Sequence, residues 1–208
     1  MRARTEELRQ AHVKIAKLMR AVLYLVIGTI IGQTEFGDAQ VKVASWLDAL
    51  RPASWNKSGL SIPVAPSVQG DIDPRCRALA RPAELEEDRH VQEQGWDLVG
   101  AYQGGWRMLI IRGTAAYDGM CRPRQYQVFV FVRGVFAGTL SPEVMDSRTD
   151  GALNQVFLQS DGQLIAEYLR YAAKDPLCCP SRTTRVEFRF GGDGPALRPM
   201  SASTSPNR

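Results

Sequence analysis

The sequence has few of the residues, and none of the short motifs, on which enzyme chemistry most often depends. It contains only two histidines, His12 and His90, and neither has a partner at the spacing of a metal site. His90 lies among charged residues of an expected helix, where a solvated surface role fits best. A Gly-x-Ser-x-Gly, Walker, His-Glu-x-x-His or Cys-x-x-Cys motif is also missing. We therefore predict no metal, no cofactor and no catalytic residue.

Excess charge and long hydrophobic runs are scarce as well. The formal net charge is +4 over 208 residues, whereas nucleic-acid-binding domains are usually strongly basic on one face. We expect no nucleic-acid partner. The main uncharged apolar run covers residues 21–32. This run is shorter than the roughly 17 to 25 residues of a membrane-spanning helix but fits the roughly 7 to 15 of a signal-peptide core.

Residues 1–39 are therefore expected to be a signal peptide or, if uncleaved, an N-terminal membrane anchor. The small residues Gly37 and Ala39 precede Gln40 in the pattern that signal peptidase recognises. Translation from Met19 in place of Met1 would also give a compact signal sequence, and both starts remain open. The prediction is an exported protein, either periplasmic or attached to the inner membrane, with residues 21–32 as the tether.

Two alternatives compete with a cleaved signal. A buried amphipathic helix of a cytosolic protein is disfavoured because the apolar run has no polar face. A full membrane span reaching back to Val13 would bury Lys14, Lys17 and Arg20. Each of these charges costs roughly 2.5 to 3.5 kcal/mol at a bilayer centre.

The four cysteines fit an exported chain, because disulfides persist only in oxidising compartments. Cys178 and Cys179 are adjacent. Neighbouring Cα atoms are about 3.8 Å apart, below the roughly 4.4 to 6.8 Å of an ordinary disulfide. We therefore expect the two neighbours to bond elsewhere, one to Cys76 and the other to Cys121.

The remainder divides into three parts. Residues 40–74 contain several prolines and are expected to form a linker with a short helix near its start. Residues 75–190 are expected to be the folded domain. Residues 191–208, rich in Pro, Gly, Ser and Thr, are expected to be a disordered tail.

The predicted fold class is α+β, with one N-terminal helix packed on a mainly antiparallel meander sheet of about six or seven strands, stapled by disulfides. The helix begins near Pro82 and ends at Gly95. Expected strands cover residues 96–102, 106–115, 126–133, 135–140, 154–159, 163–171 and 184–190. Arg133-Gly134 and Asp161-Gly162 are expected hairpin turns.

Alternation predicts which strands are buried. Residues 126–132 place three valines on one side and two phenylalanines on the other, which favours a central strand buried on both faces. Residues 184–190 alternate apolar and charged side chains, as a half-buried strand does.

Residues 145–151 form a dense polar segment and contain the candidate ligand-binding residues Asp146, Ser147, Arg148 and Asp150. The carboxylates are suited to bind a cation, or to flank an arginine that holds an anion. The competing interpretation, which we favour, is that Asp and Ser cap turns and that the arginine makes a structural ion pair.

A second polar segment surrounds Cys121, between Arg122 and Arg124. Neighbouring arginines would lower the pKa of a thiol and activate it. In an exported chain, a structural disulfide at this loop is the favoured interpretation.

Several linked strings resemble the LppP/LprE lipoprotein family in its cyanobacterial form: residues 119–123, 126–132, 136–142, 145–153 and 175–182. The resemblance covers about residues 73–190 and implies a bacterial cell-envelope domain, in a family without an established molecular function. No cysteine lies near the end of the apolar run, so this chain lacks a lipobox and no lipid anchor is predicted.

Three functions follow as hypotheses. The first is a non-enzymatic envelope domain that binds a partner protein or a small ligand through one edge or loop face of its sheet. The second is a hydrolase acting on cell-wall material, with Asp146 or Asp150 as acid or base. The third is a thiol-disulfide protein that uses a bond between Cys178 and Cys179.

Overall fold

The computed structural model describes residues 45–68, 72–105, 107–159, 162–176, 178–190 and 195–207. The expected signal peptide or anchor, residues 1–39 with the apolar run 21–32, lies outside the described residues. Among those that are described, no helix has the length and hydrophobicity needed to cross a membrane.

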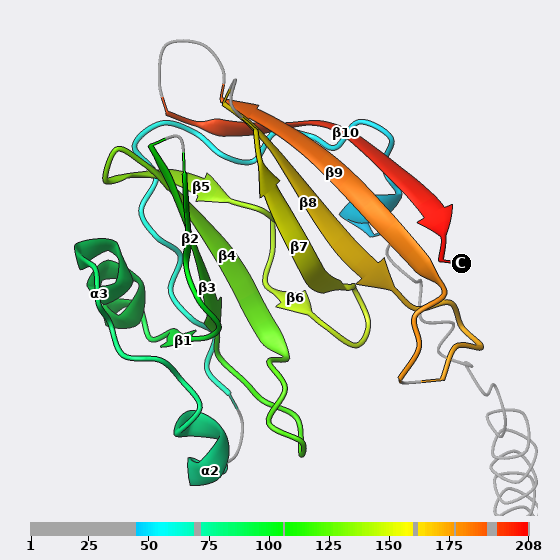
Figure 1. Ribbon diagram of the computed structural model, residues 1–208, viewed down its shortest axis with the longest axis horizontal. Coiled ribbons are helices and arrows are strands. Elements are labelled where there is room, and N and C mark those ends of the chain that lie inside the picture. Colours follow the sequence, from blue (N-terminus) through cyan, green and yellow to red (C-terminus); the bar gives the residue numbers. More distant parts are fainter. Residues whose placement is uncertain are drawn as a thin grey trace, which may run out of the picture. The chain divides into compact units, whose positions relative to one another are not determined.

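The first sheet has six antiparallel strands (Figure 1). Its central path runs in the order β1 (Asp97–Leu98), β3 (Met108–Thr114), β4 (Gln125–Val132) and β5 (Val135–Thr139). Two short strands extend it: β2 (Gln103–Gly105) pairs with β3, and β6 (Met145–Asp146) pairs with β4.

The second sheet is a four-stranded antiparallel meander. It consists of β7 (Ala152–Leu158), β8 (Gln163–Arg170), β9 (Arg182–Phe190) and β10 (Leu197–Pro206), paired in chain order. In Figure 1 these strands lie beside the first sheet, from yellow (β7) to red (β10).

One hydrophobic core joins the two sheets. The inward side chains of β3 and β4, such as Ile110 and Val130, belong to the same buried cluster as Leu164, Val186 and Phe188 of the second sheet. Because side chains alternate along a strand, every second residue of β4 enters this core. The two sheets therefore bury one face of each against the other, as in other two-sheet β proteins.

A second core covers the opposite face of the first sheet. Helix α3 (Glu86–Glu93) contributes Val91, which packs with Trp96, Phe129 and Phe131. Figure 1 places α3 on the side of the first sheet that faces away from the second. This arrangement confirms the prediction that the strand at residues 126–132 is buried on both faces.

The fold-class prediction is confirmed only in part. Antiparallel β structure with few helices is correct, and α3 lies within the expected helix 82–94. The single meander sheet is wrong, because the chain leaves the first sheet after β6 and starts a second with β7. The alternation of apolar and polar residues indicates which face of a strand is buried, but it does not indicate which strand pairs with it.

The β4–β5 hairpin turns at Arg133-Gly134, as predicted. Val132 pairs with Val135, so these two residues form the whole loop. Both have positive φ, 52° for Arg133 and 80° for Gly134, as the favoured two-residue hairpin turn requires.

The expected disordered tail is corrected by β10, which pairs with β9 along nearly its whole length. The alternate residues Leu197, Pro199 and Ala202 are buried, and a bulge between Pro199 and Ser201 shifts the register. Pro is tolerated because β10 is an edge strand, where a missing N–H donor removes no ladder bond.

The expected linker is also part of the fold. Its short helix is the 3-10 turn η1 (Trp46–Asp48), whose Leu47 is buried in the core between the sheets. Asn56 is buried and binds both sheets: its side-chain amide donates to the carbonyl oxygens of Thr139 and Leu197 and accepts from the N–H of Thr139.

The disulfide pairing differs from the expectation. Cys76 of α2 (Pro74–Arg77) bonds to Cys121, and Cys178 bonds to its neighbour Cys179. Cys76 and Cys121 both belong to segments beside the first sheet, whereas the adjacent cysteines lie in the β8–β9 connection of the second. Because the two segments of the first sheet lie apart from the β8–β9 connection, each cysteine pair bonds within its own region. Sequence spacing does not show this separation.

Candidate functional site

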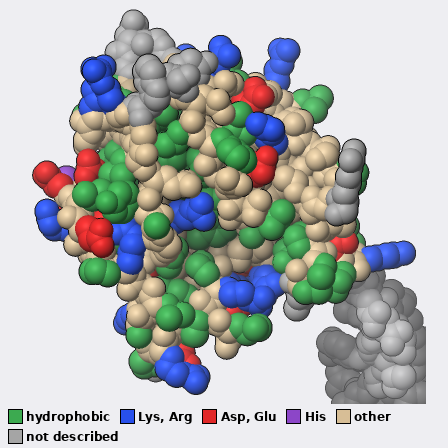
Figure 2. Space-filling view, in the orientation of Figure 1, with side chains coloured by type: hydrophobic (Ala, Val, Ile, Leu, Met, Phe, Trp, Pro, Cys, Tyr) green, Lys and Arg blue, Asp and Glu red, His purple; other side chains and the backbone are tan. Residues whose placement is uncertain are grey.

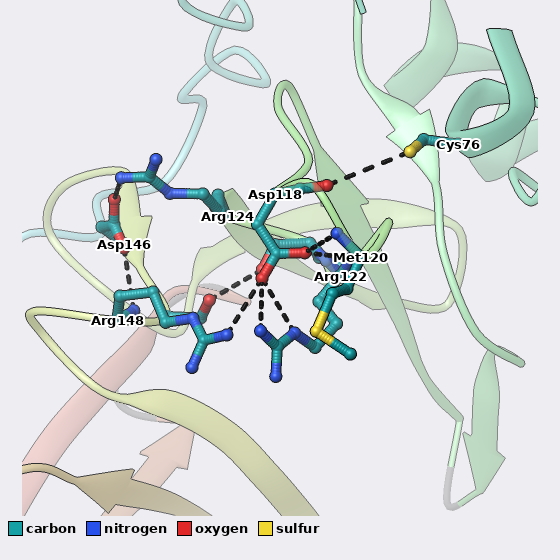
Figure 3. A network of polar contacts seen from close by, with 9 residues as sticks. Cys76, Asp118, Met120, Arg122, Arg124, Asp146 and Arg148 are labelled. Atoms are coloured by element: carbon teal, nitrogen blue, oxygen red, sulfur yellow. Dashed lines mark hydrogen bonds and ion pairs between the residues drawn. The ribbon is translucent and has the colours of Figure 1, made fainter. Parts of the chain in front are cut away.

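The candidate site is built by two loops at one end of the sheets. The β3–β4 loop carries residues 115–124, and the β6–β7 loop carries residues 147–151. Asp118 joins them, because its carboxylate accepts from Arg122 Nε at 2.8 Å and from Arg148 Nη2 at 3.0 Å (Figure 3). One carboxylate therefore serves two guanidinium groups from different loops.

Further contacts fasten the same two loops. Arg124 Nη2 lies 2.6 Å from Asp146 Oδ2, and Ser147 Oγ donates to the carbonyl oxygen of Pro123 at 2.7 Å. Asp150 accepts from the backbone N–H of Asp146 at 3.0 Å. Both candidate carboxylates are thus occupied by contacts within and between the loops, an arrangement that matches the turn-and-ion-pair interpretation.

The Cys76–Cys121 bond holds the first of these loops to α2. Cys121 has a positive φ of 59° and is half-buried. Its neighbours Arg122 and Arg124 each pair with a carboxylate, Asp118 and Asp146 respectively. The arginines therefore stabilise the loop around a bonded cysteine.

Asp118 remains ionised in this position. Its partial burial raises the pKa of the carboxyl group. The hydrogen bonds from the backbone N–H groups of Arg122 and Met120, and from the Arg122 guanidinium, outweigh burial and lower the pKa below its ordinary value. The link between the two loops is therefore an ion pair at neutral pH.

A cavity of about 370 Å³ opens between the two loops and the ends of the sheets. We call it the loop-end cavity. Its apolar and aromatic lining includes Val99, Pro123, Tyr126, Ala152, Leu153 and Tyr171. In Figure 2, Lys and Arg side chains lie next to hydrophobic ones in the region where Figure 1 places the lower ends of β4 and β6.

Three arginines contribute to the same lining: Arg112, Arg122 and Arg148. Arg122 and Arg148 share Asp118 and stand at different depths, with side chains 48% and 17% exposed. Asp118 pairs with both of these arginines. The described residues that line the cavity thus include three arginines and no acidic side chain.

Arg112 occupies an unusual position for a charged residue. It follows Ile110 by two residues on β3 and pairs with Val128 of β4, and both of these neighbours belong to the core between the sheets. Alternation therefore directs Arg112 towards the second sheet. A position that would ordinarily hold an apolar side chain carries a guanidinium.

Among the described residues, the Arg112 guanidinium has no acidic partner, and its buried Nε has no hydrogen-bond acceptor. Burial lowers the pKa of this group below its ordinary value, partly offset by the nearby Tyr126 and Tyr168 hydroxyls. An arginine nevertheless stays protonated in proteins. The cavity thus contains a permanent, half-buried positive charge.

Tyr126 is a contrasting polar group, because its hydroxyl is fully engaged. It donates to the carbonyl oxygen of Gly151 at 2.6 Å and accepts from the N–H of Leu153 at 3.1 Å. The hydroxyl thereby ties β4 to the start of β7, and the ring remains as cavity lining.

The structure brings two of the four candidate residues, Ser147 and Arg148, to the cavity. Sequence reasoning missed Arg112. The available signal was a lone charge within Met108–Thr114, a strand otherwise made of apolar and small residues. The described residues include no cluster of three metal-ligating side chains.

Taken together, the chain forms a two-sheet antiparallel β domain with a basic cavity at one end of its sheets. Residues 106–193 match the LppP/LprE lipoprotein family. The resemblance inferred from sequence is thus confirmed for β3 to β9, although the match starts later than residue 73. The family description points to the cell envelope. No curated protein and no solved structure matched the chain.

Proposed function

We propose that the chain is an exported envelope domain that binds a small molecule in the loop-end cavity without catalysing a reaction. It acts either free in the periplasm or tethered through residues 21–32. The observation that carries the proposal is the cavity itself, a concave and mainly apolar site with a few polar groups. Its volume of about 370 Å³ falls in the range of small-molecule sites, roughly 300 to 1,000 Å³.

The bracing of the cavity supports a binding role. Its mouth is formed by loops that are held by the shared carboxylate of Asp118, the Arg124–Asp146 pair and the Cys76–Cys121 bond. A site fixed in this way loses little conformational freedom when a ligand enters, and such preorganisation increases affinity.

The cysteines support export. All four are in disulfides in the described residues. Disulfides persist in the bacterial periplasm and are rare in the cytosol. The family match to a lipoprotein agrees with the same compartment.

The hydrolase hypothesis finds no specific support in the described residues. Asp146 is paired to Arg124 and Asp150 caps the turn that follows β6, so neither carboxylate stands free at the cavity. The thiol-disulfide hypothesis has a bond between Cys178 and Cys179, yet neither cysteine lines the cavity. Ligand binding is therefore the function that the geometry supports best.

The test compares ligand content of the purified protein with that of a cavity-filling variant. The full chain is expressed in a bacterial host, purified from the envelope under non-denaturing conditions and measured by native mass spectrometry. Ala152→Phe places a ring in the cavity, while Ala53→Phe adds the same ring at an exposed site. We expect a bound small molecule in the parent and in Ala53→Phe, and its loss in Ala152→Phe.

Equal small-molecule content in all three proteins would contradict the proposal, and so would a bound molecule in none of them. Peptide mapping of the same sample tests export. A chain that begins at Gln40 and contains both disulfides supports it, whereas an intact N-terminus with free thiols would place the protein in the cytoplasm.

A further inference from the structure

We infer that the ligand of the loop-end cavity is an amphiphilic organic anion, with Arg112 as the counter-ion of its acidic group. This inference rests on the proposed function, because it names the chemistry of the molecule that the cavity holds. The observation behind it is the Arg112 guanidinium, which faces the cavity with no partner among the described residues.

An unpaired buried charge is costly, and protein structures normally compensate it by a partner or by hydrogen bonds. Arg112 is half-buried, its Nε is buried without an acceptor, and no described carboxylate pairs with it, although Asp118 and Asp146 lie in the loops around the cavity. Both carboxylates are instead committed to Arg122, Arg148 and Arg124. An anion that compensates Arg112 within the cavity would come from outside the described residues.

The guanidinium geometry indicates which anion fits. Arginine presents planar, parallel N–H donors that match a carboxylate in a two-point contact. Lysine or a helix terminus would provide no such shape. A carboxylate is the simplest group that satisfies one guanidinium.

The cavity lining other than the arginines fits a ligand whose main part is apolar. The Tyr126 hydroxyl is occupied by Gly151 and Leu153, and the Ser147 hydroxyl donates to Pro123. These residues thus present rings and carbon atoms to the cavity rather than free hydroxyls. A ligand with a single acidic end and an apolar remainder matches this division, because its apolar surface is removed from water as it binds.

The positive charge around the cavity excludes cationic ligands. Arg112 adds to Arg122 and Arg148, and these last two share one carboxylate. A cation would meet three arginines and no acidic side chain in the cavity lining. Neutral molecules would leave Arg112 without a partner.

The experiment uses three probes of equal length that differ in charge: octanoate, octanol and octylammonium. Each is titrated into the full chain at neutral pH, and amide shifts in two-dimensional NMR spectra give both the affinity and the location. The variants are Arg112→Met, which keeps a side chain of similar length, and Arg89→Met, a matched change at an exposed site on α3.

We expect octanoate to bind about tenfold or more tightly than octanol, as a charge-assisted hydrogen bond provides. Shifts should centre on β3, β4 and the start of β7, and octylammonium should bind weakest. Arg112→Met should remove the preference for octanoate and retain octanol binding. Arg89→Met should leave the whole series unchanged.

Each other result has a distinct meaning. Equal binding of octanoate and octanol to the parent chain, with shifts at the cavity, overturns the anion inference and leaves the proposed function intact. An octanoate preference that survives Arg112→Met also overturns the role of Arg112. Binding of no probe, or shifts away from the cavity, contradicts the anion inference; the native mass spectra then decide separately whether the proposed function stands.

Discussion

Replacing Asn56 by alanine tests whether the proline-rich segment near the start of the domain belongs to the fold. Its side chain is only 5% exposed. Its amide nitrogen donates to Thr139 O at 2.9 Å and to Leu197 O at 3.0 Å, and its oxygen accepts from Thr139 N at 2.9 Å. One side chain therefore connects β5 of the first sheet with β10 of the second.

The expected loss follows from these three bonds. A typical hydrogen bond contributes about 1 kcal/mol net, and a buried group left without its partner costs about 1 to 3 kcal/mol. Asn56→Ala removes these three hydrogen bonds. It leaves the backbone groups of Thr139 and Leu197 without their partners, beside a small cavity. We expect the free energy of unfolding to fall by about 3 to 5 kcal/mol, which corresponds to a melting-temperature decrease of roughly 10 °C for a domain of this size.

Urea unfolding monitored by tryptophan fluorescence gives the free energy, with Lys57→Ala as control because Lys57 is exposed. Asn56→Asp adds a second check. Its carboxylate would face the carbonyl oxygens of Thr139 and Leu197, so its pKa would be raised, and its instability should shrink as pH falls towards the ordinary carboxyl pKa of about 4. A loss below about 0.5 kcal/mol for Asn56→Ala, the usual effect of a surface substitution, would show that this segment is a linker after all.

Three further changes have defined outcomes. Asp88→Asn leaves the Arg81 guanidinium without its carboxylate and should cost about 3 kcal/mol in chemical unfolding. Burial raises the Asp88 pKa, but Arg81 and two backbone N–H groups lower it overall. The stability from this carboxylate is therefore present above about pH 4 and lost on acidification. If the free energy of unfolding of Asp88→Asn falls with acidification as it does in the parent, this reasoning is refuted. Replacing Cys76 and Cys121 by serine opens a bridge across a separation of 45 residues, for which the chain-entropy estimate is about 4 kcal/mol; an equal melting temperature with and without the bond would contradict it. Arg112→Met should raise the melting temperature of the ligand-free protein, since it removes an unpaired charge, and a decrease would assign Arg112 a structural role.

The strands could be predicted from local patterns, because burial on one or two faces leaves a record in alternation. Val128 and Phe129 on opposite sides of β4 identified a strand covered on both faces, and Arg133-Gly134 identified its turn. The division into two sheets could not be predicted in this way. It depends on which strand lies beside which, and the loop at residues 147–151 carries no local signal of the change.

Composition was misleading at the C-terminal segment. Leu197–Pro206 is rich in Ser and Pro, which is typical of disorder, yet only one face of an edge strand needs apolar side chains. Leu197 and Ala202 are sufficient for that face.

The candidate site was only half visible in the sequence. Ser147 and Arg148 stood out because they lie in a polar cluster. Arg112 lies in an apolar strand, and its meaning depends on what surrounds its side chain in space. The cysteine pairing was missed for the same reason. The short distance between neighbouring Cα atoms argued against a bond between Cys178 and Cys179, whereas the separation of the two sheets' connecting segments favours it.

The contacts between the segment at residues 45–56 and strand β10 also bear on the order in which the domain forms. Asn56 meets the carbonyl of Leu197, 141 residues later, and Ala202 donates its N–H to Leu50 O at 3.0 Å. Contacts between such remote segments slow folding, because a long stretch of chain must be ordered before they form. During synthesis, residues 45–56 cannot make these contacts until β10 has been made, and β10 is the last of the described strands. The core between the sheets is therefore completed only after β10 has been made, and trimming the ten residues of β10 would also release the first segment of the domain.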